Sequence, residues 1–199
     1  MAKISLTDFV DFVIKSGTPK LTKVRQIKER GEYSPAFDFW KGLREGIIEY
    51  HTSGSTNKKL LDNISKQNDE KRAASYPSRV NAYKIFLGRK EVTWFDPPSE
   101  VWSNAGLQVS VNPEIGLLIK GTPYIIKLYF KDEPLSKSRV DTVLFLMESA
   151  LKTKAKRNSV MGVLDVLNSK LITPKPHHSD LSILLLGEAQ SFVTMWEKI

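Results

Sequence analysis

The chain has 199 residues, of which 41% are hydrophobic and 26% are charged, which suits a single folded domain and excludes wholesale disorder. No apolar run approaches the ~18 residues of a membrane span, and the N-terminus lacks the apolar segment of a secretory signal. The absence of cysteine removes disulfides, thiolate zinc sites and cysteine nucleophiles. These features predict a cytoplasmic protein with no membrane partner. A net charge of +8 makes nucleic acid a candidate partner, since basic surfaces attract phosphate polyanions.

Two helices are predicted before residue 33. Ser5 caps the first, over residues 5–15, and Asp8 falls in its first turn. A short polar helix over residues 22–30 follows and ends at Gly31. We interpret residues 1–33 as an N-terminal helical extension of one domain that covers residues 1–199.

Three further segments precede the β-rich part. Ser34 and Pro35 predict the start of an amphipathic helix through Tyr50. His51 follows at the helix end, where the helix dipole favours a partly charged imidazole. Residues 51–75 are polar, and we expect a mobile loop with a solvated helix. A helix is then predicted to begin at Pro77 and to end before Gly88.

The pattern changes to β-structure at about residue 91. Strands are predicted over residues 92–95, 107–111, 114–119 and 124–131, and the segment from 107 to 131 forms a hairpin or meander. A helix from Ser136, a strand over 160–167 and a last helix from Ser179 or Asp180 follow. The expected fold class is α/β (α+β), with a small mixed sheet, a central antiparallel β-meander (about 91–131) and flanking helices.

The hairpin register defines a candidate site. A two-residue turn at Lys120-Gly121 places Glu114 opposite Lys127, about 5 Å apart at Cβ. Gly116 beside them leaves room for a ligand or a backbone to approach. Lys127 lies among apolar neighbours, so it must reach solvent, pair with an acid or take part in chemistry.

This order of elements resembles the core of the PD-(D/E)XK nuclease-like superfamily, a restriction-endonuclease-like fold, over residues 35–170. Pro113-Glu114 resembles the first acidic motif. Ile125-Ile126-Lys127 resembles the acid-x-lysine motif, with Ile125 in place of the acid. A helix acid of the family would correspond to Glu45 or Glu49.

The resemblance implies a Mg²⁺-dependent nuclease. Glu114 and Glu49 would hold the metal, while Lys127 would activate water or neutralise phosphate. Since Ile125 replaces an acid, a migrated carboxylate could substitute for it, and the candidates are Asp141 and Glu148. Alternatively the site has lost catalysis, or the pair of Glu114 and Lys127 is an ordinary cross-strand ion pair.

A basic run follows the helix that begins at Ser136. It suits contact with phosphates, although cations at helix ends are also common for structural reasons, and it comprises Lys152, Lys154, Lys156 and Arg157. His177 and His178 are expected in a solvated loop rather than at a metal. Two functions therefore stand. One is a nuclease-like protein that contacts nucleic acid with weak or lost cleavage, and the other is a non-enzymatic interaction or scaffold protein.

Overall fold

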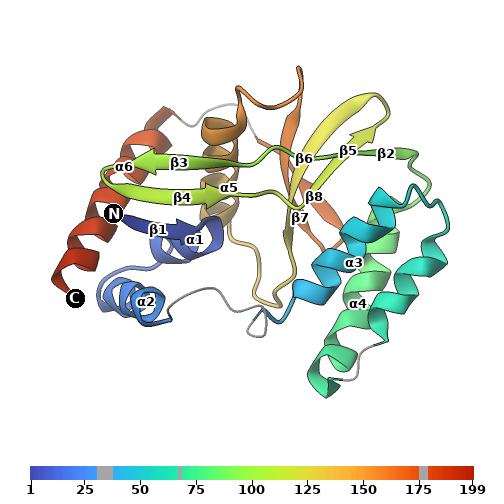
Figure 1. Cartoon of the computed structure of the whole chain (residues 1–199), viewed down its shortest axis with the longest axis horizontal. Coiled ribbons are helices and arrows are strands. Elements are labelled where there is room, and N and C mark those ends of the chain that lie inside the picture. The colour runs from blue at the N-terminus through green and yellow to red at the C-terminus, as the bar shows by residue number, and fades with distance from the viewer. Residues whose placement is uncertain (31–37, 67–68, 175–178) are drawn as a thin grey trace.

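The computed structural model describes residues 1–30, 38–66, 69–174 and 179–199, and shows a mixed α+β fold (Figure 1). The predicted cap at Ser34-Pro35, the stop at Gly31 and the pair His177-His178 lie outside the described residues. The strands are β1 (Ala2–Ser5), β2 (Val92–Phe95), β3 (Glu100–Asn104), β4 (Leu107–Val111), β5 (Ile115–Ile119), β6 (Thr122–Tyr129), β7 (Val160–Asp165) and β8 (Lys170–Ile172). The helices are α1 (Leu6–Val13), α2 (Thr18–Glu29), α3 (Lys41–Thr52), the 3-10 helix η2 (Lys58–Ser65), α4 (Glu70–Leu87), α5 (Lys137–Leu151) and α6 (Ser179–Lys198).

The described strands form two sheets. The small sheet has the order β1-β4-β3, in which β1 runs parallel and β3 antiparallel to β4. The large sheet has the order β2-β5-β6-β7-β8, and only β6 and β7 pair in parallel. Helix α5 makes the crossover between these two strands, as a parallel pair requires.

The large sheet has a hydrophobic core on each face. Core 1 joins one face to α1, α2, α5, α6 and the small sheet, through buried residues such as Phe9, Trp102 and Phe192. Core 2 joins the other face to α3, η2 and α4, through residues such as Tyr76 and Tyr83. Figure 1 shows this division, with α3 and α4 on one side of the molecule and α6 on the other. Both faces of the large sheet are therefore covered, as expected for strands with nearly continuous apolar sequence.

The hairpin prediction is confirmed in register but the meander is divided. Ile119 pairs with Thr122 and Gly116 with Ile125, as a two-residue turn demands. Lys120 and Gly121 both have positive φ, the conformation that such tight turns need. However, β4 leaves this hairpin and pairs with β1 and β3, so the predicted meander contributes to two sheets.

The N-terminal segment is more than a helical extension. Ser5 caps α1 as predicted, its Oγ accepting the N–H of Asp8. Residues Ala2–Ser5 form β1, whose Ala2 and Ile4 are buried in core 1. The first residues are thus part of the central packing.

The described residues of the polar segment 51–75 include the end of α3, the helix η2 and the start of α4. Leu61 of η2 is fully buried against α3 and α4. Helix α4 begins at Glu70, because Asp69 accepts the N–H of Arg72 as an N-cap, and Pro77 lies inside the helix. Burial of Tyr76, Val80 and other residues on the core face compensates for the hydrogen bond that the proline removes.

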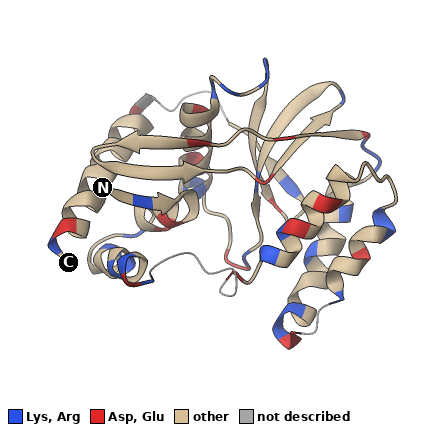
Figure 2. Ribbon diagram, viewed as in Figure 1, with Lys and Arg blue, Asp and Glu red and all other residues tan. Residues whose placement is uncertain are grey.

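No helix among residues 1–30, 38–66, 69–174 and 179–199 is long and apolar enough to cross a membrane. Basic residues are spread over the elements, and Figure 2 shows a concentration of them along the loop between α5 and β7. We call residues 152–159 the basic loop.

Candidate functional site

Glu114 and Lys127 meet as the register predicts. The Lys127 ammonium contacts Oε1 of Glu114 and also donates to the Asn112 carbonyl at 3.2 Å. The other carboxylate oxygen of Glu114 accepts the backbone N–H of Leu128 at 2.8 Å. Both side chains are largely buried, with 9% of Glu114 and 17% of Lys127 exposed. The pair thus closes the end of the β5–β6 ladder.

The space beside Gly116 is filled by the neighbouring strand. A Cβ atom on Gly116 would lie 2.4 Å from the carbonyl oxygen of Phe95 and 2.7 Å from its ring. Gly116 therefore permits close approach of β2, rather than of a ligand. Phe95, Gly116, Ile125 and Met161 form a continuous cross-strand row through β2, β5, β6 and β7.

The carboxylates around Glu114 do not fit a Mg²⁺ site. Both Glu114 oxygens already have donors, one of them a cation, whereas Mg²⁺ needs several free oxygen ligands. Lys127 shares a sheet face with Ile125 and Tyr129 in core 1, but Glu49 is exposed on α3, across the sheet. In the four described ranges, no three Asp, Glu or His side chains gather closely enough to hold a metal ion.

The proposed replacement acids also lie elsewhere. Asp141 pairs with Lys137 at 2.5 Å on α5. Glu45 is exposed and pairs with Lys41 one turn earlier on α3. Glu148 lies near the end of α5, where it lines a groove described below. The structure therefore brings together Glu114 and Lys127, and no second acid joins them from the described part of the chain.

No family model and no curated protein matches the chain. The basis for a function is thus the geometry of its own side chains. Two regions stand out, namely a groove at the basic loop and a charge network at α1.

The groove lies between the end of α5, the basic loop and the start of β7. Its volume is about 690 Å³. Its lining combines apolar, cationic and neutral polar side chains with one acid, and comprises Phe145, Glu148, Ser149, Lys152, Ala155, Lys156, Arg157, Asn158, Ser159 and Met161. Three of the four basic residues predicted to contact phosphate, all except Lys154, thus line one cavity.

The four predicted cations differ in their partners. Lys154 pairs with Glu100 of β3 at 2.5 Å and thereby lowers the pKa of that carboxyl. Lys156 places its ammonium 4.3 Å from the centre of the Phe95 ring. Lys152 and Arg157 are exposed, and neither forms an ion pair with a described carboxylate. Since Lys152, Lys156 and Arg157 have no carboxylate partner in the described chain, they give the groove a net positive rim.

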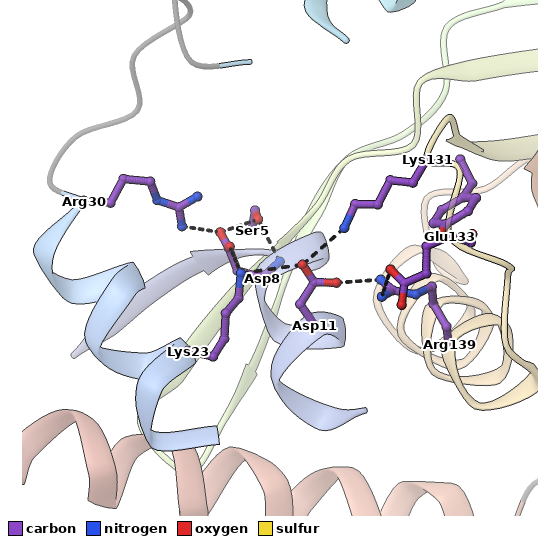
Figure 3. Close-up of polar contacts among 9 residues, drawn as sticks. Ser5, Asp8, Asp11, Lys23, Arg30, Lys131, Glu133 and Arg139 are labelled. Atoms are coloured by element: carbon purple, nitrogen blue, oxygen red, sulfur yellow. Dashed lines mark hydrogen bonds and ion pairs between the residues drawn. The ribbon is translucent and has the colours of Figure 1, made fainter. Parts of the chain in front are cut away.

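The second region is a charge network that sequence reasoning missed. Asp8 and Asp11 of α1 lie side by side, and the Lys23 ammonium bridges them at 3.1 and 3.5 Å (Figure 3). Arg30 contacts Asp8 at 2.8 Å, and Arg139 of α5 contacts Asp11 at 2.6 Å. Figure 3 shows Lys131 and Glu133 completing the network from the segment that precedes α5.

The network holds its aspartates ionised. Burial tends to raise the pKa of Asp8, but the Ser5 hydroxyl, Lys23 and Arg30 together outweigh it and lower the pKa. Burial acts on Asp11 in the same way, and Arg139, Lys131 and Lys23 together lower its pKa. Each acid is matched by cations from distant elements, so the network joins α1, α2 and α5. The visible signal was the spacing of Asp8 and Asp11, which places them on one helix face.

His51 is a buried neutral group instead of a charged helix-end residue. Its Nε2 lies 2.6 Å from the Tyr83 hydroxyl, and its ring stacks on Trp94. Burial lowers the pKa of His51 from 6.5 to about 4. The dipole argument was therefore wrong about its charge, because desolvation by core 2 dominates.

Proposed function

We propose that the chain is a nucleic-acid-binding protein of nuclease-like fold, in which the basic loop contacts phosphates. The observation that carries the proposal is the groove at that loop, where Lys152, Lys156 and Arg157 lie together without carboxylate partners among the described residues. Phosphate contacts by such cations supply most sequence-independent affinity for nucleic acid.

The topology supports the nuclease-like part of the proposal. Three antiparallel strands, β2, β5 and β6, precede α5, and β7 then pairs in parallel with β6. This is the order that the resemblance to the PD-(D/E)XK superfamily implies. The Glu114–Lys127 pair occupies the corresponding hairpin, but its oxygens are committed to Lys127 and Leu128. We therefore propose a binding role without metal-dependent cleavage at this pair.

The proposal is tested by the salt dependence of binding to labelled oligonucleotides, measured by fluorescence anisotropy. The variant Lys152→Ala/Lys156→Ala/Arg157→Ala removes three groove cations. The control Lys59→Ala/Lys66→Ala/Lys71→Ala removes the same charge from exposed positions on η2, the residue after it and α4. We expect the slope of log K against log salt to fall by about 2–3 in the groove variant, since each lost phosphate contact contributes about 0.7–0.9.

Two results would contradict the proposal. Equal slopes in the groove variant and the control would mean that the groove has no special role. Cleavage of plasmid or single-stranded DNA that requires Mg²⁺ and disappears in Glu114→Gln would establish a nuclease instead. A separate unfolding curve for each variant excludes loss of structure as the cause.

A further inference from the structure

We infer that the groove at the basic loop receives one unpaired nucleotide, with its base on the apolar floor and its phosphate on the cationic rim. This inference rests on the proposed function and adds the class of nucleic acid that the site prefers, namely single strands or unpaired ends. The inference is based on the combination of apolar and cationic side chains that line the groove.

The floor of the groove is apolar and suited to an aromatic ring. Phe145 is half-buried and packs against core 1, as does Ala155, while Met161 is a buried member of that core that also lines the groove. A volume of about 690 Å³ lies in the range of small-molecule sites, about 300–1,000 Å³. A phosphate backbone alone gains nothing from such a floor, whereas an exposed base stacks favourably on an aromatic side chain.

The polar lining also fits a base better than a phosphate. Glu148 lies at the α5 end of the groove, and its carboxylate would repel an anion but accept hydrogen bonds from a base amino group. The Oγ of Ser159 is buried, and in the described chain it has no hydrogen-bond partner. A buried hydroxyl without a partner is costly, and rotation of this side chain toward the groove would let a base edge supply that partner.

Cationic side chains line the same groove. Lys152, Lys156 and Arg157 belong to the basic loop, and Lys154 is withdrawn from it by its pair with Glu100. The groove thus offers a stacking surface, hydrogen-bonding groups and a positive rim to one ligand. A blunt duplex keeps its bases stacked inside and can use only the rim.

The test compares a single-stranded oligonucleotide with a blunt duplex of the same length, at one salt concentration. Phe145→Leu removes the ring but keeps apolar volume, and Phe145→Tyr keeps a ring. Phe39→Leu is the matched control, because Phe39 is a half-buried aromatic residue at core 2. We expect Phe145→Leu to weaken single-strand binding about tenfold, within the range of one lost base stack. Duplex binding, Phe145→Tyr and Phe39→Leu should stay within about twofold of the original.

A competition experiment separates the base from the phosphate. A nucleoside 5′-monophosphate should displace the single strand at concentrations where inorganic phosphate does not. Ser159→Ala should weaken this competition, while leaving the salt slope unchanged.

The outcomes distinguish the inference from the function on which it rests. If the groove variant loses phosphate contacts but Phe145→Leu behaves like Phe39→Leu, the unpaired-nucleotide site is wrong and the proposed function stands. Equal affinity for single strand and duplex, or equal competition by monophosphate and phosphate, would also overturn the inference. If the groove variant matches its lysine control, both are wrong.

Discussion

The charge network at α1 and the basic loop are both rich in cations. They differ in whether those cations have carboxylate partners. In the network, four cations lie around three acids, and Asp8 and Asp11 at its centre are largely buried; the members are Lys23, Arg30, Lys131, Arg139, Asp8, Asp11 and Glu133 (Figure 3). In the basic loop, only Lys154 has a carboxylate partner in the described chain. Cations that are paired with acids and join several elements suit a structural role, whereas cations without carboxylate partners at a groove support the proposed binding of a ligand.

The largest expected effect breaks the network at its least exposed cation. Arg139→Ala should lower the free energy of unfolding by about 3 kcal/mol, because it removes a nearly buried cation and leaves Asp11 with only Lys23 and Lys131 as partners. Lys137→Ala, which removes an exposed partner of Asp141, should cost less than about 0.5 kcal/mol. Urea denaturation measures both, and similar small losses would show that the network is not structural.

Lowering the pH should destabilise the fold in two stages, first through His51 in core 2 and then through Asp8 and Asp11 in the charge network. The unfolded chain protonates His51 near pH 6.5 and the folded chain only near pH 4, so the unfolded state binds more protons between these values. The free energy of unfolding should therefore fall by about 3 kcal/mol as pH drops from 6.5 to 4. Asp8 and Asp11 have lowered pKa values, so their contribution is present above pH 3.8 and is lost below it.

The control for this pH dependence is His51→Gln, measured by urea denaturation at several pH values. In this variant the free energy of unfolding should no longer fall between pH 6.5 and 4. It should still fall below pH 3.8, where Asp8 and Asp11 become protonated. An unchanged slope would mean that His51 is not the group responsible.

A smaller effect is expected at the strand-end pair. Lys127→Met should lower the free energy of unfolding by about 2 kcal/mol, since Glu114 is then largely buried without its cation. The double variant Glu114→Gln/Lys127→Met should recover at least half of this loss, because no buried charge remains. Additive losses in the double variant would contradict a structural ion pair.

The smallest effect on stability should come from the basic loop. Lys152→Ala/Arg157→Ala should change the free energy of unfolding by no more than about 0.5 kcal/mol, since both side chains are exposed. The same variant should weaken oligonucleotide binding in anisotropy measurements. A large loss of stability without a loss of binding would place the loop with the structural network and reverse the comparison.

The sequence predicted local features better than distant pairings. The turn at Lys120-Gly121 and the alternation around it set the register, so the meeting of Glu114 and Lys127 was predictable. The short strand β3 was missed, since it follows two prolines and has weak alternation. Strand β1 was missed because it has only four residues, and its partner β4 is distant in sequence.

The same distinction holds for the candidate sites. The four cations at 152–157 lie within six residues of sequence, so their closeness in space followed from the sequence alone. The partners of Asp11 include Lys131 and Arg139, which lie more than a hundred residues away. The unpartnered Ser159 hydroxyl and the groove depend on how the basic loop packs, which no local pattern specifies.

The pairing of β1 with β4 has a consequence for how the chain folds as it is synthesised. Ala2 pairs with Leu107, and α6, near the other end of the sequence, packs on the same small sheet. The β5–β6 hairpin can form as soon as it leaves the ribosome, because its contacts are local. Strand β1, by contrast, pairs with a strand about a hundred residues away, so this contact carries the entropy cost of closing a long loop and is expected to form slowly.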